Sequence, residues 1–239
     1  MPRAKVIAKA TRALKVITKA TRKPRRGAWP PDPVRVRSLI DGLEELYPDV
    51  DSALHRSSAY ELLVATILSA QTTDERVNMV TPALFAKYPT PADLAAADPT
   101  ELEEIVRSTG FFRSKAKNLI GMAEAVEERY SGKIPTELDD FVTLPGVGRK
   151  TGNVVRSVWY GLPGLPVDTH VTRLSHRLKL TNEDDPVKIE HDLGGLIPPD
   201  EWGKFSLRLI EHGRRVCTAR KPRCDQCVLA GICPSAFKF

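Results

Sequence analysis

The sequence predicts an all-α fold, and three observations lead to this prediction. Residues that favour helix N-termini recur along the chain, each ahead of apolar residues spaced for one face of a helix. Short loops separate these stretches, which are long enough for helices of about three turns. No stretch alternates convincingly between apolar and polar residues, as a half-buried β-strand does. The 239 residues suffice to bury one large core or two modest ones.

The first predicted helix follows a proline-rich linker at residues 29–33. Asp32 suits the N-cap, and the proline after it suits the first position of a helix over residues 33–46. A second helix follows the sequence Ser58-x-x-Glu61, which has the spacing of a capping box. Both starts depend on hydrogen bonds between near neighbours in the chain, so the sequence predicts them directly.

The middle of the chain continues the helical pattern. Asp98 opens the next predicted helix, and Gly110 closes it because glycine readily adopts the left-handed conformation that ends helices. Ser114 precedes a longer amphipathic stretch. Two predicted helices, over residues 137–144 and 149–160, then flank a tight glycine turn.

The last two predicted helices each follow an aspartate. Asp168 caps a helix that carries Val171, Leu174 and Leu178 on one face. Asp200 caps another helix, which carries an apolar face of its own.

The net charge of +6 is distributed unevenly. Residues 1–26 contain ten of the 36 lysines and arginines and no acidic residue, so the rest of the chain carries 26 basic and 30 acidic residues. We expect residues 1–32 to form a basic flexible arm and linker. The arm suits a solvated tail, a non-specific DNA tether or a targeting peptide, and the sequence leaves these three open. Any DNA affinity of the folded part must come from local basic clusters.

The segment Leu144–Asn153 predicts a phosphate-binding hairpin. Gly146 and Gly148 allow a tight turn, and the helix that follows presents its positive end and its free N–H groups. We therefore expect Gly146, Val147, Gly148 and Arg149 to contact a DNA phosphate without reading bases. The alternative is a plain corner between two helices with a lysine on the surface.

Lys150 and Asp168 are the candidate catalytic residues. The amine of Lys150 can attack a carbon electrophile once it is neutral, forming a Schiff base, and the helix N-terminus and Arg149 both disfavour its charged form. Asp168 has a structural role as an N-cap, worth about 1 kcal/mol. It can also accept a proton from the amine or stabilise positive charge on a sugar, and the two roles are compatible.

Four cysteines occupy the last part of the chain, at Cys217, Cys224, Cys227 and Cys233. No secretory apolar region precedes the cysteines, so we expect a cytoplasmic protein, with organelle targeting by the arm left open. No run of eighteen apolar residues occurs, so we expect no membrane span. The spacing therefore favours a metal or a cluster, with zinc or two disulfides as alternatives. The first two cysteines enclose three cations that suit a phosphate clamp, Arg220, Lys221 and Arg223.

Four motifs in this order resemble the endonuclease III family of DNA glycosylases. They are Ser-Ala-Gln-Thr-Thr-Asp at 69–74, Leu-Pro-Gly-Val-Gly-Arg-Lys-Thr at 144–151, Val-Asp-Thr-His at 167–170, and Cys-x6-Cys-x2-Cys-x5-Cys. The resemblance covers about residues 33–235. It implies two helical domains, a six-helix barrel with a helix-hairpin-helix and an iron–sulfur cluster domain, with the active site in the cleft between them. It also implies a bifunctional glycosylase and abasic-site lyase that removes oxidised pyrimidines from duplex DNA and carries a [4Fe–4S] cluster.

The resemblance assigns roles to individual residues. Lys150 matches the nucleophile, Asp168 the catalytic carboxylate, and the four cysteines the cluster ligands. Gln71 matches a residue that fills the hole left by the flipped nucleotide, although it also suits a polar residue at a helix C-terminus. Phe111 falls where the family places an apolar wedge, although it also suits a core aromatic. The family commonly has alanine where this chain has Thr72 and Gly152, and the Phe111–Phe112 pair is a further departure; these differences bear on lesion preference.

The domain prediction follows from the resemblance. We expect a barrel domain over residues 54–164, with the helix-hairpin-helix near 138–160, and a cluster domain over residues 33–53 plus 165–239. The expected partner is duplex DNA with damaged pyrimidines or abasic sites, bound by a monomer. One rival is a monofunctional adenine glycosylase, which usually lacks the lysine and continues into a further C-terminal domain. The other is a non-catalytic DNA-binding module with structural zinc, for which Lys150→Ala would retain all function.

Overall fold

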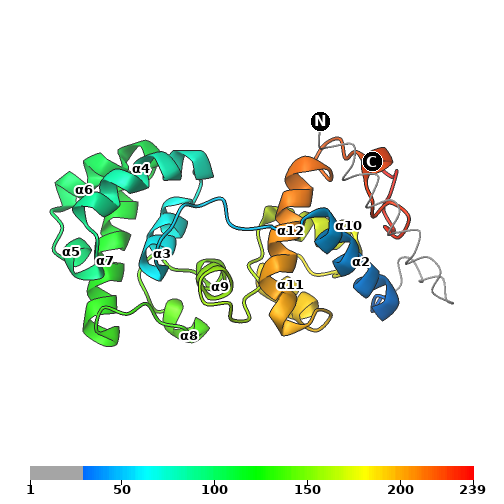
Figure 1. Cartoon of the computed structure of the whole chain (residues 1–239), viewed down its shortest axis with the longest axis horizontal. Coiled ribbons are helices and arrows are strands. Elements are labelled where there is room, and N and C mark those ends of the chain that lie inside the picture. The colour runs from blue at the N-terminus through cyan, green and yellow to red at the C-terminus, as the bar shows by residue number, and fades with distance from the viewer. Residues whose placement is uncertain (1–28) are drawn as a thin grey trace. The chain divides into compact units, whose positions relative to one another are not determined.

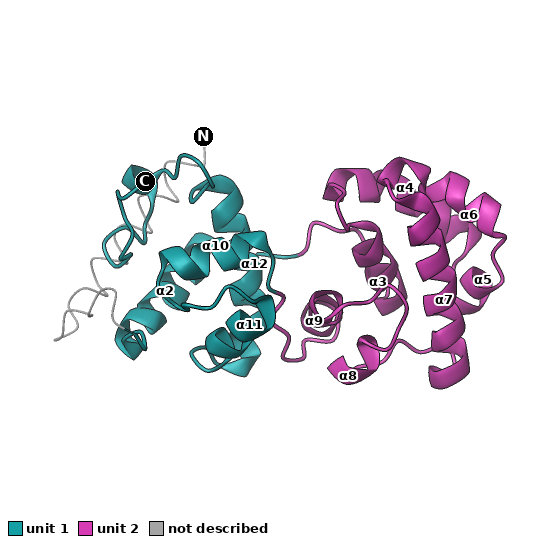
Figure 2. Cartoon of the chain, turned by 180° about the vertical axis from the view of Figure 1, so that it is seen from behind, with its two compact units in different colours: residues 1–51, 167–239 teal, residues 52–166 magenta. Residues whose placement is uncertain are grey.

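The computed structural model describes residues 29–239, which form helices joined by loops (Figure 1). These described residues contain no β-strand, so the all-α prediction is confirmed. They divide into two compact units, coloured separately in Figure 2. One unit is Ser52–Pro166, and the other joins the described residues up to Asp51 to Val167–Phe239. The predictions for the basic arm concern residues 1–28, which lie outside the described residues.

The unit Ser52–Pro166 is built around one buried helix. Its helices are, in chain order, α3 (Ala59–Leu68), α4 (Asp74–Lys87), α5 (Pro91–Ala95), α6 (Pro99–Val106), the short 3-10 helix η1 (Arg107–Thr109), α7 (Phe112–Tyr130), α8 (Leu138–Phe141) and α9 (Arg149–Val158). Helix α3 packs against α4, α7 and α9 (Figure 1). Leu62, Leu63 and Val64 on consecutive positions of α3 are fully buried, as expected for a helix enclosed by others.

The other unit is a smaller group of helices. It contains α2 (Pro33–Leu46), α10 (Thr169–Arg177), α11 (Pro186–Gly194), the 3-10 helix η2 (Pro199–Glu201), α12 (Trp202–Arg215) and the 3-10 helix η3 (Cys224–Gln226). Helix α12 packs against α2 and α10. The fully buried Arg35 of α2 donates to the carbonyl oxygens of Leu178 at 2.6 Å and Lys179 at 3.2 Å. This guanidinium joins α2 to the end of α10 and finds acceptors for a buried charge.

The predicted N-caps at three aspartates are confirmed. Asp32 accepts a hydrogen bond from the Val34 N–H at 2.9 Å at the start of α2. Asp98 accepts one from the Glu101 N–H at 2.9 Å at the start of α6. Asp168 is the N-cap of α10. In each case the acceptor lies two or three residues from the donor, so tertiary packing has little influence on the bond.

Two other predicted helix starts are wrong. Ser114 does not cap α7, because the helix begins at Phe112 with the left-handed Phe111 as its N-cap. Asp200 does not cap α12 either, since it lies within the 3-10 helix η2, which leads directly into Trp202. In both cases a tight segment comes directly before the helix: the left-handed Phe111 before α7 and the 3-10 helix η2 before α12. This segment determines the first helical residue, so the predicted side chain does not lie at the N-cap.

The predicted capping box is present only in part. Ser58 accepts from the Glu61 N–H at 3.1 Å, but the Glu61 carboxylate accepts from the N–H of Ser57 at 2.5 Å instead of that of Ser58. The complete reciprocal box is at Thr90 and Asp93, at the start of α5. The extended backbone of Ser58 lets the carboxylate reach one residue further back.

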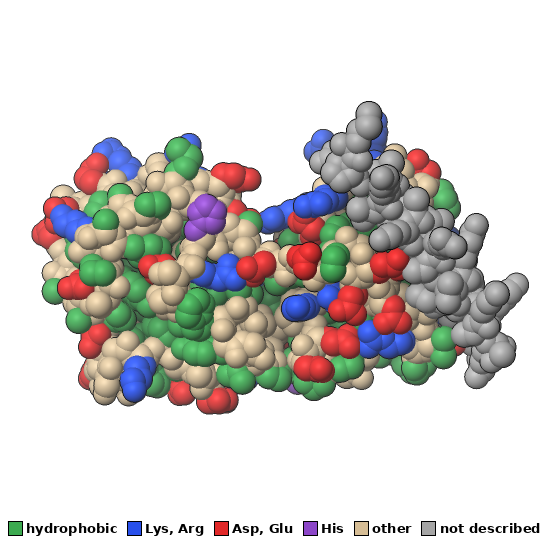
Figure 3. Space-filling model, viewed as in Figure 1, with side chains coloured by type: hydrophobic (Ala, Val, Ile, Leu, Met, Phe, Trp, Pro, Cys, Tyr) green, Lys and Arg blue, Asp and Glu red, His purple; other side chains and the backbone are tan. Residues whose placement is uncertain are grey.

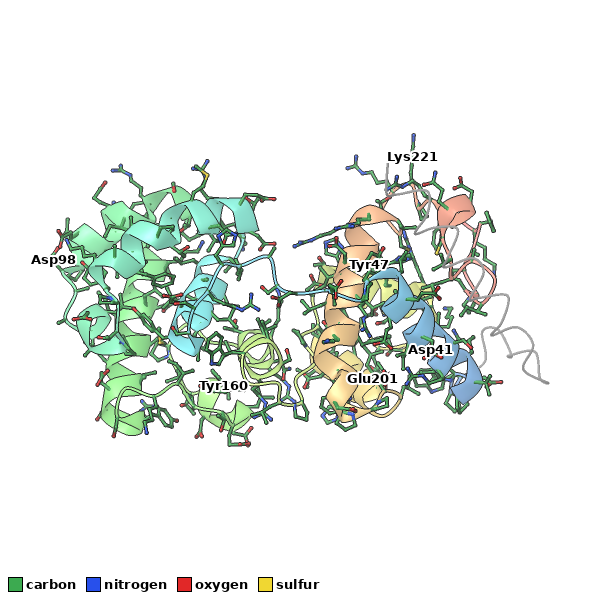
Figure 4. All side chains as sticks on the ribbon, viewed as in Figure 1. Asp41, Tyr47, Asp98, Tyr160, Glu201 and Lys221 are labelled. Carbon is green, nitrogen blue, oxygen red and sulfur yellow. The ribbon has the colours of Figure 1, made fainter. Side chains whose placement is uncertain are left out.

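Charges of both signs are interspersed on the face drawn in Figure 3. Within the smaller unit, Arg37 pairs with Asp41 at 2.6 Å and with Glu201 at 2.8 Å, and Figure 4 labels both acids. The same pairs raise the pKa of Arg37 well above its ordinary range. Such pairing agrees with the near balance of acidic and basic residues outside residues 1–26.

Candidate functional site

The glycine turn joins α8 to α9 and ends at an uncapped helix N-terminus. The Val147 N–H donates to the Leu144 carbonyl at 3.1 Å, which closes the turn. Gly146 has φ of +73°, and a Cβ added there would lie 2.7 Å from the Cβ of Asn118 on α7. The residue before α9 is Gly148, so no side chain caps the helix, and a Cβ added there would meet nothing within 4 Å. The first turn of α9 therefore has no side-chain cap, and open space lies beside its N-cap residue, which suits an anion-binding turn.

Lys150 is the second residue of α9, and its side chain is exposed. Helix α9 is held against α8 at Gly152, where an added Cβ would lie 2.9 Å from Leu138 Cδ1 and 2.9 Å from Phe141 Cβ. Glycine at 152 thus allows the two helices to approach closely. The lysine is consequently carried by a helix with little freedom to move relative to its neighbour.

Asp168 lies in the other unit as the half-buried N-cap of α10. Its Oδ1 accepts from the Val171 N–H at 2.8 Å. This bond fixes the carboxylate on the helix axis and satisfies one N–H of the first turn, so the predicted structural role of Asp168 is confirmed.

His170 follows two residues later and is part of the support for α10. Its Nδ1 lies 3.1 Å from an Arg173 Nη2, which also donates to the Gly213 carbonyl at 3.0 Å and the Cys217 carbonyl at 3.1 Å. Burial lowers the pKa of His170 below 6.5, with Asp168 acting in the opposite direction. A neutral, packed imidazole agrees with a structural role for His170.

Gln71 and Phe111 lie in two loops of the unit Ser52–Pro166. Both are exposed, and both have left-handed backbones, with φ of 55° and 49°. Phe111 is 67% exposed, which rules out the alternative of a core aromatic; its neighbour Phe112 packs against the core instead. Gln71 is not at a helix C-terminus, because α3 ends three residues earlier at Leu68.

Sequence reasoning did not find the residue that connects these two loops. Lys115 of α7 is buried, and its ammonium donates at 2.8 Å to the Leu68 carbonyl, to the Thr72 hydroxyl and to the Thr109 carbonyl. Burial lowers its pKa. The only sequence signal is a lysine among the apolar positions of an amphipathic helix, which is a weak one because surface lysines are common.

The four cysteines line one cavity, whose empty volume, its open mouth included, is about 430 Å³. No group of three or more His, Cys, Asp or Glu side chains in the described residues is gathered to hold a single metal ion, whereas all four thiols face this cavity. The four residues are free cysteines, so the described residues contain no disulfide among them. Burial raises the pKa of Cys227 to about 12 and also raises the pKa of Cys233. The thiolates therefore need a cationic group in the cavity, and four sulfur ligands fit an iron–sulfur cluster.

Arg177 of α10 supports the cysteine loop, a role that no sequence pattern indicated. Its guanidinium donates to the Cys217 sulfur at 3.3 Å and to the carbonyls of Thr218 and Ala219, each at 2.8 Å. The ring of Phe239 lies over the same guanidinium at 4.1 Å. No local pattern marks such a residue, because its partners are about 40 positions away in the chain.

The predicted cation cluster lies on the loop between the first two cysteines. Arg220, Lys221 and Arg223 are all exposed, and Figure 4 shows Lys221 extending outward. The loop is closed by a hydrogen bond of 3.0 Å from the Arg223 N–H to the Val216 carbonyl and by one of 2.7 Å from the Thr218 hydroxyl to the Lys221 carbonyl. Its conformation depends on the cysteine cavity, to which both ends are attached.

The helical hairpin and the cysteine loop define the class of protein. Residues 64–199 match the HhH-GPD superfamily of base excision DNA repair proteins, and residues 217–233 match the iron–sulfur binding domain of endonuclease III. The chain is therefore a base-excision DNA repair enzyme of the helix-hairpin-helix class, with an iron–sulfur binding domain at its C-terminal end.

Individual relatives narrow the class to one family. The chain is 54% identical over 203 residues to endonuclease III of Synechocystis sp., covering 84% of this chain and 93% of that one, and 41% identical to that of Bacillus subtilis, covering 85% and 94%. It matches solved structures of a non-covalent endonuclease III–DNA complex and of a trapped endonuclease III–DNA covalent intermediate. Their TM-scores are 0.81 and 0.82, each at 40% identity over 86% of this chain and 97% of the other. This chain belongs to the endonuclease III family, whose members are bifunctional DNA glycosylases and abasic-site lyases.

These findings exclude both rival functions, the monofunctional adenine glycosylase and the non-catalytic module with zinc. No helix in the described part of the chain has the length and apolar character to cross a membrane.

Proposed function

We propose that the enzyme acts on oxidised pyrimidines in duplex DNA and that Lys150 is its nucleophile. The observation that carries this proposal is the placement of Lys150: an exposed amine in the first turn of α9, beside an uncapped helix N-terminus. A phosphate bound by the turn would hold the adjoining deoxyribose within reach of the amine. The solved complexes of relatives with DNA support the same partner.

The chemistry follows from an amine that reaches the anomeric carbon. The Lys150 nitrogen forms a bond to C1′ as the glycosidic bond breaks, and the base leaves with its bonding electrons and takes up a proton. The sugar ring then opens, so that O4′ becomes a hydroxyl and an imine joins the protein to C1′. The imine acidifies C2′, and loss of a C2′ proton expels the 3′ phosphate by β-elimination. Water hydrolyses the imine and restores the amine.

We assign Asp168 the part of the carboxylate in this reaction. Because Oδ1 is engaged by the Val171 N–H, Oδ2 is the oxygen that we assign to the chemistry. It would accept the proton that the ammonium must lose and then stabilise the positive charge that develops on the sugar. The N-cap bond holds that oxygen in a defined position while it acts.

The DNA contacts divide into positioning and insertion. We assign phosphate contacts to the turn Gly146–Arg149 and to the exposed loop cations Arg220, Lys221 and Arg223, because backbone N–H groups and cations bind phosphates without reading bases. Within the turn, Val147 is buried and its N–H is already bonded to Leu144, so its neighbours Gly146, Gly148 and Arg149 are the residues that we expect to make the contact. We assign insertion into the base stack to Gln71 and Phe111. A phenylalanine that is 67% exposed loses water contact when it enters the stack, which offsets part of the cost of flipping a nucleotide.

The two compact units support a barrel domain over residues 54–164 and a cluster domain over residues 33–53 plus 165–239. Cys217, Cys224, Cys227 and Cys233 would hold a [4Fe–4S] cluster, which supplies a fixed cross-link for the cation loop. We further propose that the enzyme works as a monomer in the cytoplasm, on chromosomal DNA.

Borohydride trapping tests the central assignment. Borohydride reduces an enzyme–DNA imine to a stable amine, so the holoenzyme with duplex containing an oxidised pyrimidine should give a covalent adduct. Lys150→Ala should give none, whereas Lys117→Ala, which removes an exposed lysine of α7, should trap like the unmodified enzyme. A Lys150→Ala protein that still forms the adduct would contradict the assignment.

A further inference from the structure

The buried ammonium of Lys115 is the strongest feature that the reaction scheme leaves unused. Lys115 is 5% exposed, and its three hydrogen bonds to Leu68, Thr72 and Thr109, each of 2.8 Å, use all three donors of the ammonium. No carboxylate takes part, so neutral oxygens alone compensate the buried charge. Removing the ammonium would take one donor from each of these three oxygens, which lie on different parts of the chain.

The three acceptors lie at or beside the two loops that carry Gln71 and Phe111. Leu68 is the last residue of α3, Thr72 follows Gln71 in the loop after that helix, and Thr109, the last residue of η1, lies two residues before Phe111. The Thr72 hydroxyl also donates to the Thr109 carbonyl, so the loops touch directly.

Lys115 also acts through its backbone. Its N–H donates to the Phe111 carbonyl at 3.0 Å, which closes the first turn of α7 on that residue. One residue thus holds Phe111 by its main chain and both loops by its side chain. The connected group, which we call the loop clasp, consists of Lys115, Thr72 and the carbonyls of Leu68 and Thr109.

The loop clasp stabilises conformations that a non-glycine residue rarely adopts. Gln71 and Phe111 both have positive φ, which is unfavourable for a residue with a Cβ. Such conformations persist only when the surrounding structure determines them, and they cluster where function needs a pre-set geometry. The clasp holds the residues on both sides of Gln71 and the residue two positions before Phe111. The Thr72 hydroxyl accepts from Lys115 and donates to Thr109, and an alanine at this position could make neither bond.

We propose that Lys115 is a positioning residue which, through Thr72, holds Gln71 and Phe111 as one preorganised pair for entry into the DNA stack. This inference rests on the proposed insertion of Gln71 and Phe111. Preorganisation lowers the entropy that the two loops lose when DNA binds. Removal of the clasp therefore slows nucleotide extrusion and leaves the affinity for undamaged duplex unchanged.

The test measures extrusion directly in the holoenzyme. Duplexes carry an oxidised pyrimidine opposite 2-aminopurine, whose fluorescence rises when the lesion leaves the stack. In Lys115→Met we expect the extrusion rate and single-turnover base excision to fall about tenfold or more, since one lost charged hydrogen bond is worth about that factor and the variant loses three. Thr72→Ala should show a smaller loss, and Thr72→Ser, which keeps the hydroxyl, should restore the rate. Lys117→Met removes the same charge from the exposed face of α7 and should behave like the unmodified enzyme.

A double-mutant cycle separates positioning from a general effect on the fold. Phe111→Ala should slow extrusion strongly in the unmodified enzyme and only slightly in Lys115→Met, because an unheld phenylalanine already contributes little. If the two losses are additive, or if Lys115→Met extrudes at the unmodified rate, the proposal for Lys115 is overturned. If Lys115→Met does not fold, the same cycle with Thr72→Ala decides by the same criterion.

Failure of the insertion assignment would look different. In that case Phe111→Ala and Gln71→Ala would extrude the lesion at the unmodified rate even with Lys115 intact, and the proposed roles of the two inserting residues would be wrong. If Phe111→Ala and Lys115→Met each slow extrusion strongly and their effects are additive, the insertion assignment is retained and only the proposal for the loop clasp is rejected.

Discussion

The glycine turn allows a sharp prediction, because two glycines only two residues apart should respond in opposite ways to alanine. At Gly146 the backbone has φ of +73°, and an added Cβ would lie 2.7 Å from Asn118 Cβ. At Gly148, the N-cap residue of α9, φ is −91° and an added Cβ meets nothing within 4 Å.

The magnitudes follow from these geometries. Gly146→Ala places a Cβ in the left-handed region, which costs about 1–2 kcal/mol, and crowds α7, which costs about 1–3 kcal/mol. The reduced freedom of the unfolded chain returns about 0.4–1 kcal/mol, so we expect a net loss of roughly 2–4 kcal/mol. In Gly148→Ala the reduced freedom of the unfolded chain again favours the folded state, and this offsets the weaker N-cap that alanine makes. The free energy of unfolding should therefore change by no more than about 0.5 kcal/mol.

The assay combines unfolding with DNA binding. For a domain of this size the loss in Gly146→Ala corresponds to a fall in Tm of roughly 5–12 °C, measured on the holoenzyme by far-UV circular dichroism. Gly148→Ala should melt like the unmodified enzyme but bind lesion duplex about tenfold more weakly, since its methyl group enters the space that we assign to the phosphate. Equal melting shifts in the two variants would refute the reasoning about the turn. Unchanged affinity in Gly148→Ala would refute the phosphate assignment.

Further predictions concern other parts of the enzyme. Lys150→Gln should still bind lesion DNA but lose strand cleavage, because it removes the amine and leaves the turn intact; equal losses in a gel-shift assay and a nicking assay would contradict this. Deleting residues 1–28 should lower general DNA affinity and flatten its dependence on salt, with single-turnover excision nearly unchanged; an unaltered slope would reject the tether. Because burial lowers the pKa of His170, the folded state binds fewer protons than the unfolded state, so stability should fall as the pH drops below 6.5; His170→Gln should reduce that slope in urea titrations. Chelating iron from residues 217–233 should weaken DNA binding through the cation loop, with iron and sulfide lost together, whereas release of zinc would contradict the cluster.

Local patterns predicted much of the secondary structure. Asp32, Asp98 and Asp168 cap helices because each side chain bonds an N–H two or three residues away. The helix starts predicted at Ser114 and Asp200 are wrong, because the segment before each helix determines where the helix begins. Helices α4, α5 and α11 went unpredicted, although Thr73, Thr90 and Asp185 precede them as N-caps, because each buries few apolar side chains.

Part of the candidate site could also be predicted from the sequence, and part could not. Spacing alone brought out the glycine turn with Lys150, and the cysteine series, because each is a continuous stretch of chain whose chemistry depends on neighbouring residues. Adjacent phenylalanines look alike in a sequence, and only packing shows that Phe111 is exposed while Phe112 packs against the core.

By itself, the amino-acid sequence determined the helical class, three N-caps, the glycine turn before α9 and the cysteine loop, since all of these arise from contacts within a few residues. Tertiary structure alone decided that the ammonium of Lys115 lies between two loops, and that Arg177 reaches the cysteine loop about 40 residues further on. The physical reason is that a buried charge takes its hydrogen bonds from whichever oxygens the packed helices bring near it. That choice depends on the whole core and leaves no periodic signal in the chain.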